Sequence, residues 1–213
     1  MRSVNMVVAI INFSSFIASC LIMSYLYILS IQPVKRAKKY GEKAWSDCKK
    51  FRSIGGFLEL ISMVNLLIWI WFPLPIVDTW IISPNIWIGI IIAVCIAIPC
   101  CIIMFLGIKA AGSETLSPSK ETEMYGGIYR YIRHPQSLGE FPLFISLSFA
   151  FNSWFLVLIS SLFIIIYIPI MIHYEEKDLT ERFGDKYREY QKSTGALFPK
   201  LRKREIKKFV LVP

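Results

Sequence analysis

The chain has 213 residues, of which 55% are hydrophobic, with a mean hydropathy of +0.52 and a formal net charge of +9. Soluble domains average about 45–50% apolar residues, so this composition argues against an ordinary soluble domain. The basic residues flank apolar segments, which argues against nucleic-acid binding and favours contact with anionic lipid headgroups. No C-x-x-C pair occurs among the five cysteines, so they predict neither disulfides nor a metal site.

Long apolar segments follow one another along the chain. They cover residues 5–31, 54–72, 86–108 and 138–173. Runs of about 18 or more apolar residues are typical of transmembrane helices, and Asn152-Ser153 offers a turn within the last segment. We therefore predict an all-α integral membrane protein with about five transmembrane helices, the last two forming a hairpin over 138–151 and 154–173. The first arm of this hairpin spans only about 21 Å at a helical rise of about 1.5 Å per residue.

The lysines and arginines predict the orientation. All of them except Arg2 lie in three segments, residues 35–52, 109–133 and 177–208. The positive-inside rule places these segments and the C-terminus in the cytoplasm and the N-terminus outside, and the N-terminal segment does not resemble a cleaved signal peptide. We expect one membrane domain over residues 1–213, in which 1–112 form a three-helix scaffold. Residues 113–213 then carry a cofactor-binding loop, the hairpin and a cytoplasmic C-terminal helix.

The C-terminal segment has a helical pattern. Leu179, Phe183, Tyr187 and Tyr190 recur at spacings of four, four and three residues, which places them on one helix face. No clear stop precedes Gly195, so the last membrane helix is expected to continue into the cytoplasm and pack this face on the bundle. The alternative is an amphipathic helix that rests on lipid.

Two polar residues interrupt the second apolar segment. Glu59 is a carboxylate inside a membrane helix, which makes it a functional candidate, although it also lies close enough to the cytoplasmic end to reach the interface. Asn65 lies deeper and is expected to form a hydrogen bond with a neighbouring helix.

The segment GGIYRYIRHPQSLGE precedes the predicted hairpin. Pro135 disfavours a helical conformation at His134 and suits the first position of a helix, so we expect a helix to begin there. Its free N–H groups, together with Arg130 and Arg133, would attract a carboxylate or a phosphate. The alternative is a helix end anchored among lipid headgroups.

Glu175 and Glu176 stand where the last apolar segment ends. In an antiparallel hairpin they share one layer with His134. A positive helix start and a carboxylate at one level suit a zwitterion such as an amino-acid group. The alternative is a solvated acidic pair offset by Lys177.

The motifs G-I-Y, R-H-P, E-E-x-x-L, F-G-x-x-Y-x-x-Y and F-P follow in order within residues 113–200. This ordered set resembles the isoprenylcysteine carboxyl methyltransferase and phospholipid methyltransferase family. The resemblance implies methyl transfer from S-adenosylmethionine to a lipid or lipid-linked acceptor that enters from the bilayer, and it implies no obligate protein partner. The implied cofactor contacts are Glu121, Thr122, Glu123, Met124, Tyr129, His134, Pro135, Gln136, Ser137 and Glu175.

Three positions depart from the family pattern. Ser137 stands where the family usually has Tyr, and residues 121–124 read ETEM where it has an H-x-L-V loop. Met171 stands where prenylcysteine enzymes carry an Arg for the substrate carboxylate, which argues against that acceptor. His173 is a possible substitute, and with Glu176 it forms the tentative acceptor site. An amine acceptor would have to lose a proton, which either of these two residues could accept.

Two other functions agree with parts of the sequence. Some sterol reductases have a similar C-terminal bundle and bind a nicotinamide cofactor, although they are longer. A membrane protein that keeps the fold without the activity would accommodate the altered loop and Ser137.

Overall fold

The computed structural model describes residues 2–120 and 126–200. Its helices are α1 (Arg2–Ser30), α2 (Pro33–Tyr40), α3 (Lys43–Trp69), α4 (Ile86–Ala111), α5 (Pro135–Glu140), α6 (Pro142–Ala150), α7 (Trp154–Phe183) and α8 (Asp185–Ser193), with short 3-10 helices η1 (Gly112–Thr115) and η2 (Gly127–Arg130). The described residues contain no named strand, which confirms the predicted all-α class. The predicted cofactor loop, residues 121–124, lies outside the described residues.

Four helices are long and apolar enough to cross a membrane. They are α1, α3, α4 and α7. The expected first arm of the hairpin, 138–151, is instead divided between α5 and α6, of 6 and 9 residues. Pro142 stands at the junction and has no N–H group to continue the helical hydrogen bonds. The described residues therefore supply four candidate crossings, and a fifth crossing is not confirmed.

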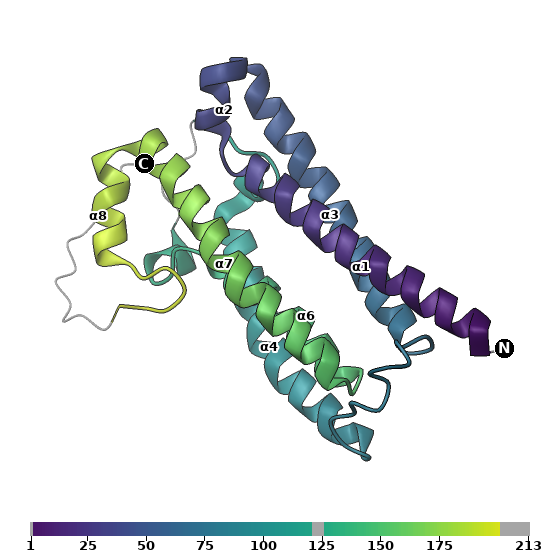
Figure 1. Cartoon of the computed structure of the whole chain (residues 1–213). Coiled ribbons are helices and arrows are strands. Elements are labelled where there is room, and N and C mark those ends of the chain that lie inside the picture. Colours follow the sequence, from purple (N-terminus) through teal and green to yellow (C-terminus); the bar gives the residue numbers. More distant parts are fainter. Residues whose placement is uncertain (1, 121–125, 201–213) are drawn as a thin grey trace.

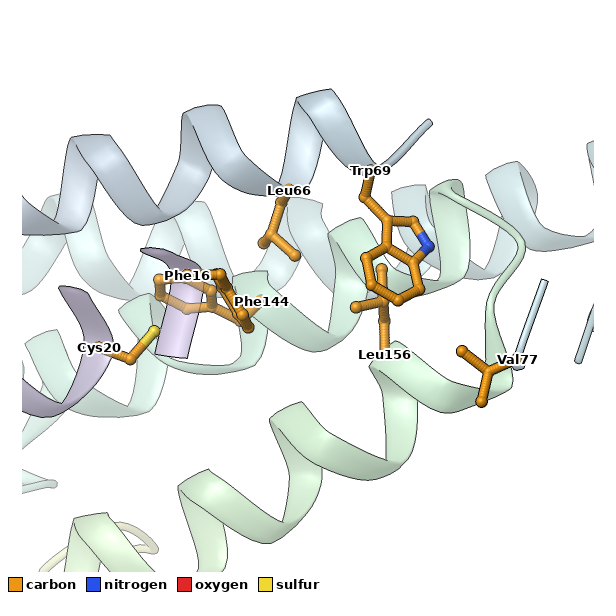
Figure 2. Close-up of a cluster of buried hydrophobic side chains, with 7 residues drawn as sticks. All are labelled: Phe16, Cys20, Leu66, Trp69, Val77, Phe144 and Leu156. Carbon is orange, nitrogen blue, oxygen red and sulfur yellow. The ribbon is translucent and has the colours of Figure 1, made fainter. Parts of the chain in front are cut away.

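The long helices form two groups (Figure 1). α1 and α3 run antiparallel to each other, and α4, α6 and α7 form the second group, in which α6 contacts both α4 and α7. A buried cluster joins the groups: Phe16 and Cys20 of α1, Leu66 and Trp69 of α3, Phe144 of α6, Leu156 of α7, and Val77 of the loop after α3 (Figure 2). The core near the ends of α3 and α6 therefore fixes how the α1–α3 pair sits against the rest.

Hydrogen bonds reinforce the contact between α1 and α3. The Asn65 side chain donates to Ser15 Oγ at 3.2 Å, and the Asn12 side chain donates to the Asn65 carbonyl at 3.0 Å. These bonds confirm the structural role that the sequence predicts for Asn65.

The predicted turn at Asn152 is present, and it is tied to the loop before α4. Asn152 has a positive φ of 55°, a conformation that Asn tolerates better than most residues. Its side chain accepts a hydrogen bond from the Ser83 N–H at 3.0 Å and donates to the Ser83 carbonyl at 2.8 Å. The loop and the α6–α7 turn are thereby held together.

The last long helix ends earlier than the sequence indicates. Gly184 takes a φ of 61°, and its N–H donates to the Thr180 carbonyl at 2.9 Å, the kind of C-terminal stop that glycine permits. The prediction of one helix continuing to Gly195 is therefore wrong. α8 instead folds back, and the Tyr190 hydroxyl donates to the Tyr129 carbonyl at 2.5 Å.

Candidate functional site

The His134 ring lies between two carboxylates. Its Nδ1 is 3.0 Å from Glu175 Oε2, its Nε2 is 3.0 Å from Glu176 Oε1, and its side chain is only 4% exposed. The helix α5 begins at Pro135, as predicted. The structure thus brings the R-H-P and E-E motifs into one layer, as the sequence indicates.

This environment sets the charge of the imidazole. Burial lowers the pKa of His134, but hydrogen bonds and charge interactions with Glu175 and Glu176 outweigh burial and raise the pKa from 6.5 to about 9. With a carboxylate at each ring nitrogen, the protonated ring can donate to both. His134 therefore carries a positive charge at neutral pH.

Glu176 holds the C-terminal segment in place. Its Oε1 accepts from Arg133 Nε at 2.7 Å, and its Oε2 accepts from the Gln191 side chain at 2.8 Å. Arg133 also donates through Nη1 to the carbonyls of Gln191 and Thr194. Glu176 is therefore engaged by the protein itself, and its tentative role in binding an acceptor stays a prediction.

Five of the predicted cofactor contacts line one cavity of about 70 Å³ beside α5: Tyr129, His134, Gln136, Ser137 and Glu175. Pro135 is fully buried at the helix start and does not line this cavity. His173 does not line it either, and its exposed ring packs edge-on against Tyr174. The binding roles of these residues remain predictions.

Other charged residues also reach the same cavity, and of these the sequence analysis pointed only to Arg133, beside the helix start. They are Arg52, Glu114, Arg133, Asp178 and Arg182. A signal for two of them was present, because Asp178 and Arg182 follow Glu175 by three and seven residues and so share its helix face. Arg52 and Glu114 belong to other elements, and no local pattern connects them to the motifs.

Glu114 links three elements at the cavity. Its Oε1 lies 2.7 Å from Arg182 Nη1, and its Oε2 accepts from the Ser119 N–H at 3.0 Å. Arg52 donates to the Glu114 carbonyl at 2.7 Å and to the Thr115 carbonyl at 3.1 Å. η1 is thereby fixed between α3 and α7.

Arg182 keeps unused donors on the cavity wall. Its side chain is only 6% exposed, yet within the described part of the chain its Nε and Nη2 have no hydrogen-bond partner. A buried donor without a partner costs free energy unless a ligand or water satisfies it. This arginine therefore offers a site for an anionic group.

Two of the departures from the family pattern lie in contact with each other. The Ser137 hydroxyl is 4.0 Å from the Met171 sulfur, and both residues are buried. The nearby Gln136 side chain donates to Thr115 Oγ1 and to the Tyr129 hydroxyl, each at 3.0 Å. The wall around Ser137 and Met171 is thus less polar than the wall around Gln136.

Comparisons with known proteins agree with the motifs. Residues 84–186 match the family described as phospholipid methyltransferase. A methanethiol S-methyltransferase of Pseudomonas deceptionensis is 40% identical over 76 residues, a match that covers 36% of this chain and 28% of that protein's length. The predicted family resemblance is thereby confirmed. This resemblance and the four apolar helices support the prediction of an integral membrane protein.

Proposed function

From the phospholipid methyltransferase match over residues 84–186, we propose that the chain is a membrane methyltransferase that uses S-adenosylmethionine. The observation that carries the proposal is the convergence of two separate family motifs on one charged cavity, where His134 and Glu175 lie 3.0 Å apart. By the positive-inside rule, we place this cavity at the cytoplasmic face.

The charged residues of the cavity fit this cofactor. Its methionyl part is a zwitterion, so the unpartnered Nε and Nη2 of Arg182 would hold the carboxylate, and Glu175 would hold the ammonium. Tyr129 and Gln136 offer further polar groups. Sites for molecules of this size usually measure about 300–1,000 Å³, so a cavity of about 70 Å³ would have to open to take the whole cofactor.

The bound cofactor would supply an electrophilic methyl group, and the chain's own residues would position it. Such a transfer is an in-line displacement that needs alignment and exclusion of water rather than a covalent nucleophile. His134 is held from both sides by Glu175 and Glu176, so the orientation of its ring is set before any ligand enters.

We propose that the acceptor reaches this site from the bilayer. A lipid or lipid-linked molecule, which the motifs imply, would do so. A small apolar molecule such as the thiol in the relative's name would also partition into lipid. Membrane lipids are then the surroundings of the enzyme, and we propose no obligate protein partner.

Calorimetry on the full chain in detergent tests the cofactor. We expect S-adenosylmethionine to bind, and we expect His134→Gln and Glu175→Gln each to weaken binding by about tenfold or more, the usual effect of losing a hydrogen bond to a charged group. Glu189→Gln, an exposed site on α8, is the matched control. Binding of NADPH alone would instead support a reductase, and binding of neither would support a protein without this activity.

A labelling experiment then identifies the acceptor. Membranes that contain the chain are incubated with methyl-labelled S-adenosylmethionine, and the labelled product is identified by mass spectrometry. We expect the label in a molecule that partitions into the bilayer, and none when His134→Gln replaces the wild-type chain.

A further inference from the structure

A second cavity adjoins the first. It measures about 150 Å³ and shares four wall residues with the smaller one: Tyr27, Arg52, Thr115 and Gln136. The Gln136 amide, held by Thr115 and Tyr129 at 3.0 Å each, belongs to this common wall. The two spaces are therefore neighbours that share this wall.

Two carboxyl groups from different helices meet in the second cavity. Glu59 of α3 and Glu140 of α5 both line it, so their side chains border one small space. Two negative charges in one small space of low dielectric constant repel each other, which favours a proton on one of the two carboxyl groups. We therefore expect the pair to consist of one carboxylic acid and one carboxylate.

Away from the shared wall, which carries Arg52, Thr115 and Gln136, the rest of the lining is mostly apolar. Met23, Phe141 and Tyr167 contribute to the walls. Gly56 also borders the space, and a Cβ added there would meet nothing within 4 Å. Ionisable groups at membrane depth are costly and usually mark functional sites. A cavity with an apolar side and a carboxyl pair suits a small apolar molecule with a single polar end.

The charge of the pair restricts that polar end. Arg52 on the shared wall already donates to the Ser30 hydroxyl and to the carbonyls of Glu114 and Thr115. A carboxylate acceptor beside the Glu59–Glu140 pair would therefore meet a like charge in a medium of low dielectric constant and be repelled. A thiol or an amine would be accepted, and it must lose a proton before or during methyl transfer. The unprotonated oxygen of the pair is a group that can take this proton.

We propose that this cavity is the acceptor site and that the Glu59–Glu140 pair takes the proton from a thiol or amine acceptor. This inference rests on the proposed methyltransferase function. The S–H or N–H bond of the acceptor breaks, and its proton moves to the carboxylate of the pair. The acceptor's lone pair forms the new bond to the methyl carbon, the old bond from that carbon to the sulfonium breaks, and its electron pair neutralises the sulfur. The proton then leaves to water.

Kinetics with small acceptors test the assignment. We expect the wild-type chain in detergent to methylate propanethiol or propylamine, and the two probes distinguish a thiol site from an amine site. Glu59→Gln and Glu140→Gln should each lower the rate with the accepted probe by about 100-fold or more, the usual contribution of a general base. Glu59→Asp should retain more activity than Glu59→Gln because it keeps a carboxyl group, and the exposed Glu189→Gln should match the wild type.

The outcomes separate this inference from the proposed function. If the wild type binds no S-adenosylmethionine, the proposed function fails first. If it binds, but both Gln variants keep rates within about threefold of the wild type, only the acceptor site is wrong. Preferential methylation of octanoate, a carboxylate acceptor, would also overturn the proposed acceptor site. Equal rates for Glu59→Asp and Glu59→Gln would overturn it too.

Infrared spectroscopy provides a measurement that needs neither cofactor nor acceptor. Difference spectra of wild type minus variant at neutral pH should show the C=O stretching band of a protonated carboxylic acid for both Glu59→Gln and Glu140→Gln. Glu189→Gln should give no such band. Absence of the band in both Gln difference spectra would mean that the pair holds no shared proton, and the proposal would be lost.

Discussion

Arg182 and Glu114 form a buried ion pair at the wall of the candidate cofactor cavity. Arg182 Nη1 lies 2.7 Å from Glu114 Oε1, and the two side chains are 6% and 8% exposed. The guanidinium also lies over the Trp45 ring, 5.4 Å from its centroid. One edge of the arginine is therefore fixed by the protein, while Nε and Nη2 remain without partners in the described residues. This geometry leads to the first prediction.

Arg182→Lys should weaken binding of S-adenosylmethionine by about tenfold or more. Lysine keeps the charge but loses the planar set of donors that reaches Glu114 and an anion at the same time. Calorimetry in detergent measures the change. Arg188→Lys is the matched control, because Arg188 is exposed and pairs with Asp185 at 2.9 Å. Equal affinities for both variants would show that Arg182 does not face the cofactor.

Glu176→Gln should destabilise the fold by about 3–5 kcal/mol, the usual cost of removing one member of a buried ion pair. The Arg133 and Glu176 side chains are only 9% and 16% exposed, and Arg133 Nη2 lies 2.6 Å from Glu176 Oε1. The change would leave the charges of Arg133 and His134 poorly compensated. Thermal unfolding in detergent, followed by circular dichroism, measures the loss.

The exposed pair on α8 provides the control for this loss. Arg188 and Asp185 are 62% and 88% exposed, so Asp185→Asn should change the free energy of unfolding by less than about 1 kcal/mol. If Glu176→Gln has an effect as small as this, Glu176 does not anchor the C-terminal segment.

The stability of the protein should fall in mildly alkaline solution because of His134. Its pKa rises from 6.5 to about 9 in the folded state, so its contribution is fully present below about pH 6.5 and is lost as the pH rises through about 9. A shift of this size is worth on the order of 3 kcal/mol. The free energy of unfolding, measured from pH 6 to pH 10, should decline for the wild type and stay flatter for His134→Gln. Parallel declines would contradict this origin.

Local chemistry allowed several parts of the site to be predicted. Pro135 starts a helix because its ring fixes φ, and Asn152 turns the chain, so the layer shared by His134 and Glu175 followed from the sequence. The contacts of Arg52 with Glu114 could not be predicted, because they join residues 62 positions apart and no periodic pattern connects them.

The helix ends were harder to predict than the helices. Gly184 stops α7, but a glycine in a helical pattern is also tolerated within a helix at a cost of about 1 kcal/mol, so the sequence alone did not decide between the two. The division of the predicted hairpin arm into α5 and α6 has a similar origin. Pro142 suits the start of a new helix as well as a kink, and the close packing of α5 on α4 decides the outcome.

Gly139→Ala tests this close packing. A Cβ at Gly139 would lie 2.5 Å from the Cys100 carbonyl oxygen and 2.6 Å from the Met104 backbone nitrogen, distances too short for nonbonded atoms. Both neighbours belong to the backbone of α4 and cannot rotate away. We expect a loss of about 1–3 kcal/mol in the free energy of unfolding, as is usual for overpacking, measured by thermal unfolding in detergent.

The substitution should also weaken cofactor binding, because α5 carries Gln136 and Ser137 at the wall of the cavity. Gly56→Ala is the matched control for the free energy of unfolding but not for binding, because Gly56 lines the second cavity. A Cβ at Gly56 would meet nothing within 4 Å, and replacing a helical glycine by alanine usually stabilises a helix by about 1 kcal/mol. The two Gly→Ala changes should therefore shift the unfolding midpoint in opposite directions. If both raise it, α5 does not approach α4 as closely as the structure shows, and the position of the cavity wall would have to be revised.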